Sequence, residues 1–450
     1  MITRRSRLAL LIVPALALAT ACTGGGDNPS GATASGDQTL KIGLLTQLRG
    51  PSQAAGSEAQ NGAKLAVDVI NGLNPSIPLP LASDAGLPNL GGAKVSLVVK
   101  DVTPGAVDPK TSEAEAETGV DEVQKAAGEA VTDLVSNQGV NALIGAYDPE
   151  VTEAASQRAE RFEVPFINAD SPATFLTDAG RDWFFRIGPT WRQAGQAFFS
   201  LPGEDPNIKI DKIAVLYAQD KAGQDVVTST KELAKEGGLD QPNKVATFGF
   251  KPDGSNAAAA YAGVRAYNPD TLLLYSSPAS VQPLLQAVAT SGWKPKAALS
   301  FSLGYVTAQT FDPAAAAVDG LMRSTSWSIE AAQRNPAAQA VTGLYQRRFN
   351  SQMTEAAASA FTAVMTAAQA VNNAGTVDEQ RVRSALLSLN IPGEQTIMPW
   401  AGIQFDETHQ NTLAQPLIEQ YHNRAFSIIY PSDAAANGAK PIYPAPNAAG

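Results

Sequence analysis

Blocks of apolar residues alternate with helix-length amphipathic segments from about Thr39 onward. Turn residues such as Gly50-Pro51-Ser52 separate the blocks, and the apolar pattern predicts strands at 40–48, 94–102, 140–147 and 164–170. The alternation begins again after Gly188-Pro189, with strands expected at 212–220, 245–250, 271–278 and 297–303. Strands that are apolar on both faces belong in parallel sheets covered by helices. The pattern therefore predicts an α/β fold with two Rossmann-like, doubly wound parallel-sheet lobes.

Helical periodicity marks the segments between and after these strands. A helix is expected over 57–71, because its apolar side chains share one face: Ala59, Ala63, Ala66, Val67 and Ile70. From about Arg323 the chain turns to helical material, notably the Ala-rich stretch 356–373. A short strand-like region follows at 402–421, and residues 431–450 form a polar tail rich in Pro and Ala.

The N-terminal segment predicts export and lipidation. Arg4, Arg5 and Arg7 precede an apolar stretch that is too short to span a bilayer, and small residues then lead to Cys22, the single cysteine. This pattern resembles a bacterial lipoprotein signal, which predicts a signal peptide over 1–21 and a lipid on Cys22. Residues 22–38 are rich in Gly and Ser and are expected to form a flexible tether to the outer face of the cell membrane. An ordinary signal followed by a chance cysteine is the alternative.

Charge and composition exclude several classes of function. The net charge of −10 becomes −13 once the three signal arginines are removed, so no nucleic-acid partner is expected. No second long apolar run predicts a transmembrane helix, and one lipidated cysteine leaves none for a disulfide. His409 and His422 stand too far apart from each other in the sequence to suggest a zinc site, and no metal or cofactor is expected.

Several stretches resemble the leucine-binding-protein-like class of type I periplasmic binding proteins. The strand, Gly-Pro loop and N-G-A-x-x-A-V-x-x-I-N helix of that class match residues 42–72. Further matching stretches follow in the expected order: ALIGAYDPEVTEAAS, VPFINADSPAT, FFRIGPTWRQAGQA, KIAVLYAQDKAGQD, residues 267–274 and DGLM at 319–322. The resemblance covers most of 40–430, and a lipoprotein signal fits a Gram-positive or actinobacterial member.

The resemblance implies a type I periplasmic binding protein fold with a three-crossing hinge, near 185–188, 323–326 and 391–400. Lobe 1 would span 39–186 and 325–391, and lobe 2 would span 187–324 and 392–430. The implied function is a monomeric solute-binding lipoprotein that closes on a small molecule and delivers it to the permease and ATPase of an ABC importer. A sensor that signals to a membrane partner is an alternative within the same fold.

The binding site is expected in the loops at the carboxyl ends of the strands, because open α/β sheets bind ligands there. The predicted ligand-binding residues are Ser52, Tyr147, Asp148, Thr152, Asp170, Ser171, Asp220, Tyr275, Ser276, Phe301, Ser302 and Tyr305. Structural readings compete for many of them, since Asp148 before Pro149 is placed to cap a helix and the aromatic residues also suit a core. Trp327 is a further candidate wall, whereas Trp183 and Trp191 are expected in the core.

The ligand expected from these loops differs from the amino acids that the class usually binds. Relatives grip a carboxylate in these loops, whereas this chain carries Asp148, Glu150 and Asp170 there, and Ala55 and Ala222 replace frequent aromatic residues. Carboxylates repel an anionic group, so a neutral polar or cationic solute is predicted: amino-acid-like, an amide or related. Arg49 would reverse this prediction if it pointed into the cleft instead of lying on the surface.

An exported hydrolase is a remote third function. The sequence has no G-x-S-x-G elbow, no H-E-x-x-H motif and no cysteine in the predicted folded body. Asp148 and Glu150 form a pair of carboxylates, but acids at a helix start are an ordinary capping pattern. The protein is therefore expected not to be an enzyme.

Overall fold

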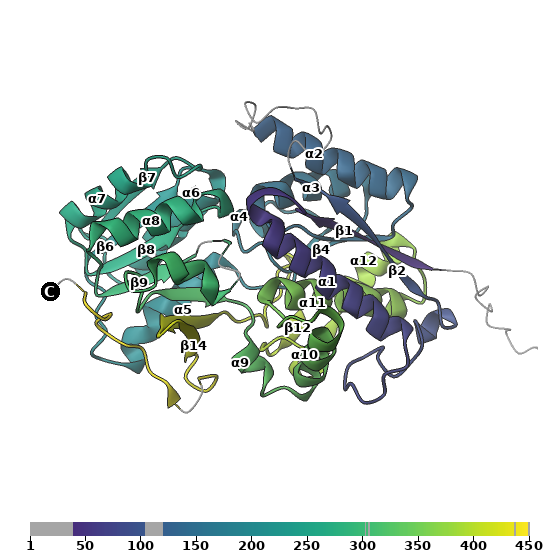
Figure 1. Cartoon of the computed structure of the whole chain (residues 1–450). Coiled ribbons are helices and arrows are strands. Elements are labelled where there is room, and N and C mark those ends of the chain that lie inside the picture. The colour runs from purple at the N-terminus through teal and green to yellow at the C-terminus, as the bar shows by residue number, and fades with distance from the viewer. Residues whose placement is uncertain (1–38, 104–119, 302, 305–306, 436–437, 449–450) are drawn as a thin grey trace, which may run out of the picture. The chain divides into compact units, whose positions relative to one another are not determined.

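The computed structural model describes residues 39–103, 120–301, 303–304, 307–435 and 438–448 (Figure 1). The predicted signal peptide, the lipidated Cys22 and the tether lie outside these residues. Among the described helices, none is both long and apolar enough to cross a membrane.

A five-stranded parallel sheet with its packed helices forms the first lobe. Its strand order is β2-β1-β3-β4-β5, and β1 pairs with β2 and β3 through Leu40 opposite Val95 and Ile42 opposite Ala142. The strands are β1 Leu40–Thr46, β2 Val95–Asp101, β3 Ala142–Gly145, β4 Phe166–Asn168 and β5 Phe184–Arg186. Its first helices are α1 Gln53–Asn71, α2 Val120–Thr132, α3 Pro149–Phe162 and α4 Phe175–Asp178.

A seven-stranded sheet with its packed helices forms the second lobe, in the order β14-β13-β10-β9-β8-β6-β7. The strands are β6 Ile213–Ala218, β7 Val245–Phe250, β8 Thr271–Tyr275, β9 Ala297–Ser300, β10 Met322–Thr325, β13 Leu417–His422 and β14 Ala425–Tyr430. Its helices are α5 Trp191–Glu204, α6 Lys221–Glu236, α7 Ala257–Tyr267 and α8 Val281–Ser291. Strands β6 to β10 pair in parallel, whereas β13 and β14 add an antiparallel edge.

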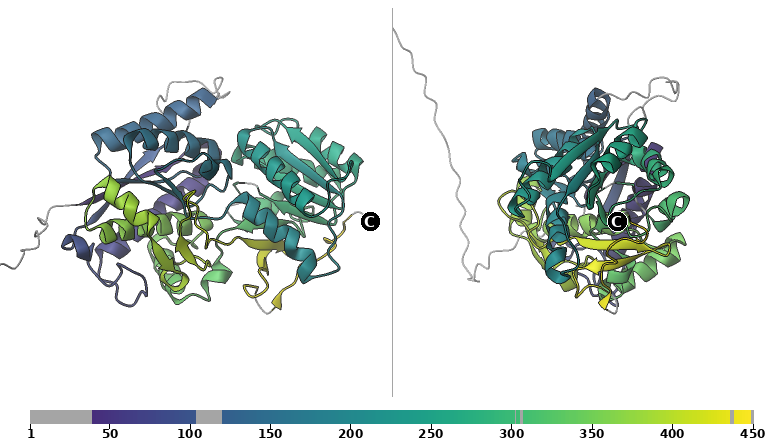
Figure 2. Two further views of the ribbon diagram at one scale, coloured as in Figure 1. Left: turned by 180° about the vertical axis from the view of Figure 1, so that it is seen from behind. Right: turned by 90° about the vertical axis from the view of Figure 1, so that its left-hand side faces the viewer.

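Helix α11, Glu355–Ala374, returns the chain to the first lobe and packs along α1 (Figure 1). Small residues permit the close approach, because a Cβ on Gly62 would lie 1.9 Å from the carbonyl oxygen of Ala357. Figure 2 shows the same first lobe from behind, with the yellow-green helices of the late chain beside its purple strands. The other helices after β10 are α9 Ile329–Ala332, α10 Pro336–Phe349 and α12 Glu379–Leu387.

The last crossing between the lobes differs from the expected one. Ile397, Met398, Trp400 and Ile403 belong to the hydrophobic cluster of the first lobe, and a small hairpin of β11 Asn390–Pro392 and β12 Gly402–Gln404 lies among them. The second lobe therefore does not resume at residue 392, since its next strand begins at Leu417. These short apolar runs have no helical or strand period, so their sequence does not show which core they join. The other expected boundaries stay predictions.

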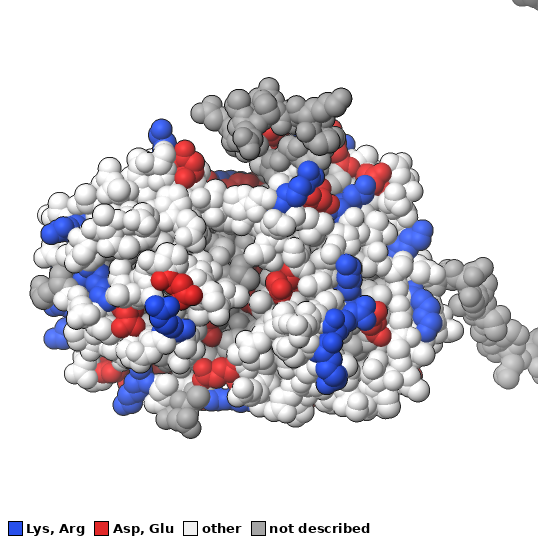
Figure 3. Space-filling model, viewed as in Figure 1, with Lys and Arg blue, Asp and Glu red and all other residues white. Residues whose placement is uncertain are grey.

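The described part of the C-terminal tail packs on the second lobe. The backbone N–H of Ile442 donates to Oε1 of Gln420 at 2.7 Å, and the N–H of Ala445 donates to the carbonyl of Lys296 at 2.8 Å. On the face shown in Figure 3, acidic and basic side chains are interspersed. Open α/β sheets bind ligands beyond the carboxyl ends of their strands, so these ends of both sheets are the candidate site.

Candidate functional site

A pocket with walls from both lobes lies at the carboxyl ends of the strands. It contains about 820 Å³ of space not filled by protein atoms, part of it open to solvent. Its lining comprises Ala55, Tyr147, Ala169, Asp170, Pro172, Pro189, Thr190, Trp191, Ala194, Phe301, Leu303, Arg323, Ser324, Thr325, Ser326, Thr354, Glu355, Ala356 and Pro416. We call this space the cleft pocket.

Asp170 supplies a carboxylate to the cleft pocket just beyond the end of β4. It also lines a smaller adjoining space of about 300 Å³ not filled by protein atoms, part of it open to solvent, whose other walls include Thr46, Gly145 and Ala360. The pKa of Asp170 is raised to about 8, mainly by burial and also by the negative charge of Glu355, while the hydroxyl of Ser359 opposes the rise. Among the described residues, no Lys, Arg or His forms an ion pair with this acid.

Glu355 supplies a second carboxylate from the first turn of α11. Its Oε1 accepts hydrogen bonds from the backbone N–H of Ser326 at 2.5 Å and from the Ser326 hydroxyl at 2.8 Å. Ser326 directly follows β10, in the segment that leaves the second lobe. Glu355 thus connects the pocket wall of the first lobe to a crossing between the lobes.

Arg323 is the only Lys, Arg or His residue among the described lining residues, and its guanidinium forms an ion pair with Glu419 of the same lobe. Its Nε and Nη2 lie 2.9 and 2.7 Å from Oε2 of Glu419, a residue that is 3% exposed. The guanidinium carbon also lies 3.8 Å from the ring centroid of Phe426. The positive charge of Arg323 is therefore balanced within the second lobe.

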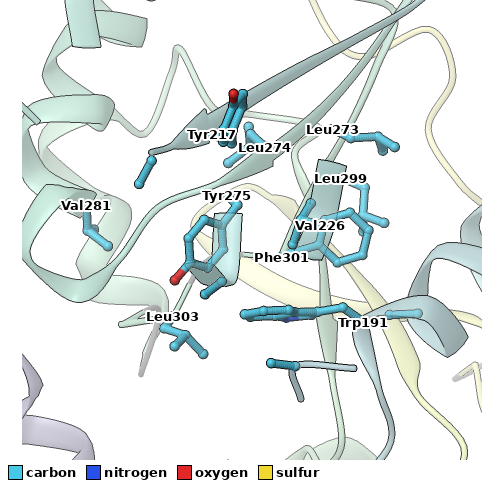
Figure 4. Packing of buried hydrophobic residues seen from close by; sticks show 14 of the residues in the cluster. Trp191, Tyr217, Val226, Leu273, Leu274, Tyr275, Val281, Leu299, Phe301 and Leu303 are labelled. Atoms are coloured by element: carbon cyan, nitrogen blue, oxygen red, sulfur yellow. The ribbon is translucent and has the colours of Figure 1, made fainter. Parts of the chain in front are cut away.

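Aromatic side chains from both lobes form the apolar walls. The Tyr147 hydroxyl, from the end of β3, accepts a hydrogen bond of 2.6 Å from the backbone N–H of Gly304 in the second lobe. Trp191 stands edge-on to Tyr275, with ring centroids 5.1 Å apart. Figure 4 shows these two rings and Phe301 close together within one hydrophobic cluster, which includes residues of both lobes. Pockets with apolar walls and few polar groups are typical of small-molecule sites.

Further contacts join the two lobes beside the cleft pocket. Oε1 of Glu150 accepts from the backbone N–H of Ala222 at 3.1 Å, and Nζ of Lys221 lies 2.6 Å from Oε1 of Glu153. The backbone N–H of Thr174 donates to Oδ2 of Asp225 at 2.8 Å. Each contact joins α3 or the start of α4 to the N-terminal half of α6.

Comparison with known proteins decides the family. A profile of the periplasmic binding protein family matches residues 122–418. The chain belongs to the periplasmic binding protein family.

Relatives of this binding protein cover nearly its whole length. It is 24% identical over 406 residues to the Leu/Ile/Val-binding protein homolog 8 of Brucella abortus (strain 2308), covering 88% of this chain and 91% of that one. A leucine-binding protein structure from Thermotoga maritima superposes with a TM-score of 0.66 at 18% identity, covering 88% of this chain and 100% of that one. A branched-chain amino acid binding protein from Streptococcus pneumoniae, in complex with isoleucine, has a TM-score of 0.64 at 19% identity, covering 86% and 98%. These structures confirm the predicted two-lobed type I fold.

Three of the predicted ligand-binding residues line the cleft pocket of the binding protein: Tyr147, Asp170 and Phe301. Ala55, which stands where relatives often have an aromatic residue, lines it as well. Ser302 and Tyr305 lie outside the described residues. The role of all these residues in ligand binding stays a prediction.

Other predicted residues lie outside the pocket lining and have structural partners. Asp148 caps α3 by accepting from the N–H groups of Glu150 and Val151, at 3.1 and 3.4 Å, and Asp220 caps α6 by accepting from Gly223 at 2.7 Å. Thr152 is fully buried and donates to the carbonyl oxygens of Ala146 and Asp148. Ser52, Ser171, Tyr275 and Ser276 are also buried outside the lining.

Two residues weighed as pocket elements lie elsewhere. Trp327 is buried in the core of the first lobe, where its Nε1 donates to the carbonyl of Ile397 at 3.1 Å, so it is not a wall of the cleft pocket. Arg49 pairs with Asp101 at 2.8 Å and its side chain is 52% exposed, which agrees with the surface reading.

Sequence reasoning missed Trp191, Arg323, Glu355 and the hydroxyl residues of the crossing segments. Trp191 was expected in the core, and it does pack there, but one part of its ring also lines the pocket. The Thr354-Glu355 pair is a recognisable helix start, since Thr354 accepts from the N–H of Ala357 at 3.4 Å. That signal predicts a helix N-terminus, but not that this terminus faces the loop after β4.

Proposed function

We propose that this protein is an extracytoplasmic solute-binding lipoprotein of an ABC importer. It is tethered to the cell membrane through a lipid on Cys22 and acts as a monomer. It captures a small polar solute, amino-acid-like, an amide or a related compound, between its lobes and delivers it to the permease, whose ATPase drives uptake. It performs no catalysis and needs no cofactor.

The observation that supports this proposal is the shared lining of the cleft pocket. Tyr147 and Asp170 come from the first lobe, and Trp191 and Phe301 come from the second. A solute that contacts both sets of residues stabilises the closed arrangement over an open one, because only the closed arrangement makes all the contacts at once. Closure around the solute is then the signal that a permease reads.

The lining favours a neutral polar or cationic solute. The relative in Brucella is named for leucine, isoleucine and valine, and the Streptococcus protein was solved with isoleucine. In this chain the carboxylates of Asp170 and Glu355 face the pocket. Asp148 caps α3 and Glu150 bonds to α6, so neither lines the pocket, and Glu355 supplies the second carboxylate instead.

A thermal-shift screen of the full-length protein tests the proposal. The panel contains amino acids, amides, urea, polyamines, sugars and aromatic acids. A ligand that binds only the folded state adds about 2.7 kcal/mol of stability at a hundred times its Kd, so a clear rise in Tm is expected. A shift with a zwitterionic branched-chain amino acid alone would contradict the neutral-or-cationic solute, and no shift across the panel would contradict solute binding.

A matched pair of tryptophan variants shows whether a hit binds in the cleft pocket. Trp191 packs edge-on against Tyr275 and lines the pocket, whereas Trp293 packs edge-on against Tyr261 with ring centroids 5.9 Å apart and does not line it. Both Trp191→Ala and Trp293→Ala remove a large packed ring and lower the stability. Only Trp191→Ala is expected to abolish the ligand-dependent shift.

A sensor of the same fold is the alternative function. Transport and sensing differ in what happens to the solute after binding. Cells that lack this protein are expected to lose uptake of the radiolabelled solute, and uptake should return with the wild-type gene. Unchanged uptake together with an altered cellular response to the solute would favour the sensor.

A further inference from the structure

The charges that face the cleft pocket do not balance one another. Asp170 and Glu355 contribute two carboxylates, and Arg323 contributes one guanidinium. Glu419 lies 2.7 Å from Nη2 of Arg323 and is itself buried, so it neutralises that guanidinium from outside the pocket. The described lining therefore presents a net negative charge to a bound molecule.

Hydrogen-bond donors of the protein stabilise these two carboxylates unequally. Ser326 donates twice to Oε1 of Glu355, from its N–H and from its hydroxyl. For Asp170, the Ser359 hydroxyl is the one group among the described residues that lowers the pKa, and it only partly offsets the rise caused by burial and by Glu355. A carboxylate held in a protein cleft gains most from a positive partner when the protein supplies none. A positive charge on the ligand should therefore contribute most to the binding free energy when it lies against Asp170.

The walls beside Asp170 suit a cation as well. Tyr147, Trp191 and Phe301 present aromatic rings to the same pocket. The faces of such rings carry negative electrostatic potential and attract alkylammonium and guanidinium groups. The small side chains Ala55, Ala169 and Ala356 leave room for a carbon skeleton between the rings.

We propose that the solute of this protein carries a protonated nitrogen that binds against the carboxylate of Asp170, and that it has no carboxylate group beside that nitrogen. This inference rests on the proposed function and narrows its solute to organic cations such as primary amines and guanidines. Glu355 lines the same pocket, and its negative charge adds to the negative potential at Asp170. The aromatic rings hold the apolar part of the cation.

Binding of such a cation is coupled to release of a proton. The pKa of Asp170 is raised to about 8, so the carboxyl group is mostly protonated at neutral pH. The groups that face it are Glu355 on α11, Tyr147 at the end of β3 and the paired Arg323 of β10. An alkylammonium with a pKa near that of lysine, about 10.4, stays charged and favours the ionised carboxylate. Affinity should therefore rise about tenfold per pH unit below about pH 8 and level off above it.

Three probes with one branched skeleton separate the possible solute charges. They are 3-methylbutylamine, its α-carboxylated form leucine, and 4-methylpentanoate, which keeps the carboxylate and lacks the nitrogen. Isothermal titration of the full-length protein is expected to show the tightest binding for the amine, weaker binding for leucine and none for the acid. Titrations in phosphate and in Tris should show about one proton released per amine bound near neutral pH, because the observed heat then depends on the buffer.

Asp170→Asn is the decisive variant, and Asp84→Asn, at an exposed site outside the pocket lining, is its matched control. Asp170→Asn should weaken amine binding about tenfold to a hundredfold and abolish the proton release, because it removes a charged hydrogen-bond acceptor. Asp84→Asn should change neither. Without ligand, Asp170→Asn should raise Tm by at least about 2 °C at pH 9 and leave it nearly unchanged at about pH 4, because the cost of burying this carboxyl group grows as pH rises from its ordinary pKa of 3.8 to about 8.

The outcomes distinguish this inference from the proposed function. Binding of leucine or 4-methylpentanoate as tight as that of the amine would overturn the inference while solute binding stood. The inference would also be overturned if none of the three probes bound while a neutral or anionic solute of the wider panel did. If no solute in either set bound, the proposed function would fail, and an unchanged Tm for Asp170→Asn at pH 9 would then overturn the inference independently.

Discussion

The carboxylate of Glu150 in the first lobe accepts a hydrogen bond of 3.1 Å from the backbone N–H of Ala222 in the second. Ala222 lies in the first turn of α6, where N–H groups lack partners within the helix. Glu150 therefore caps a helix of the opposite lobe, beside Asp220, which caps the same helix from its own lobe. Burial raises the pKa of Glu150 to about 8, with Asp148 as the second cause, and burial and Glu150 raise that of Asp220 to about 7.

The first prediction concerns the pH dependence of stability at this contact. A glutamate whose pKa is raised from 4.5 to about 8 on folding costs no stability at about pH 4, and its cost grows as pH rises to 8. Glu150→Gln keeps an oxygen acceptor for Ala222 and removes the charge, so we expect a higher Tm than wild type at pH 8 and an equal one near pH 4.5. Thermal melts across this range provide the measurement.

A charge change elsewhere gives the control for Glu150. Glu407→Gln removes the same charge from an exposed turn and should leave the slope of Tm against pH unchanged. If Glu150→Gln left the slope unchanged as well, the contact with Ala222 would not bury a charge, and the lobes would be separated in solution.

The second prediction concerns the packing of α1 on α11. A Cβ on Gly62 would lie 1.9 Å from the backbone oxygen of Ala357, so Gly62→Ala forces the helices apart. We expect a loss of about 1–3 kcal/mol, as is typical of overpacking, measured by urea denaturation. Gly128→Ala in α2 meets no atom within 4 Å and should instead add about 0.5–1 kcal/mol through helix propensity. Equal effects of the two variants would contradict the close packing.

The third prediction concerns Arg186, which is fully buried at the end of β5. Its guanidinium donates to Oε1 of Gln410 at 2.6 Å, to Oγ1 of Thr177 at 2.7 Å and to the carbonyl of Ala173. It therefore joins the loop after Asp170 to the segment before the last crossing. Arg186→Met leaves these acceptors without their donor and should cost about 3–5 kcal/mol of unfolding free energy.

The same substitution at a surface arginine is the control for Arg186. Arg348 pairs with Asp68 and is 47% exposed, so Arg348→Met should cost less than about 1 kcal/mol. Chemical denaturation of both variants measures the difference. A cost below 1 kcal/mol at Arg186 would show that water replaces its bonds, and hence that the site opens readily.

The fourth prediction concerns the membrane anchor. Cys22→Ser removes the only thiol available for lipidation, so the protein should move from the membrane fraction to the medium. Incorporation of a labelled fatty acid into the wild-type protein and its absence from the variant provide the measurement. Membrane retention of the unlabelled variant would contradict the lipoprotein signal.

Periodic features of the chain could be predicted well from its sequence. The apolar runs at 40–48 and 212–220 became the strands β1 and β6, since nearly continuous apolar residues suit parallel strands between helices. The capping reading of Asp148 is confirmed by its bonds to two backbone N–H groups of α3. Such signals are local, because a cap and its helix lie within a few residues of each other.

Features without a period were predicted less well. Residues 397–403 have no regular pattern, and they joined the first core instead of the second. The antiparallel pair β13 and β14 extended a sheet whose other strands are parallel. In both cases the segment packs where another element offers apolar surface or a free strand edge. The residues of that other element are far away in the chain, so the segment's own sequence does not reveal its position.

The sequence alone thus determined the two α/β units, their helix starts, and the expectation that acids face the cleft, because these follow from side-chain chemistry within short segments. Only the tertiary structure decided that Asp170 and Glu355 share one pocket, that Glu419 forms an ion pair with Arg323, and that Glu150 accepts a hydrogen bond from Ala222 of the other lobe. Such pairs lie tens to hundreds of residues apart in the chain. Sheet order and the paths of the crossings bring them together, and neither is encoded in any single segment.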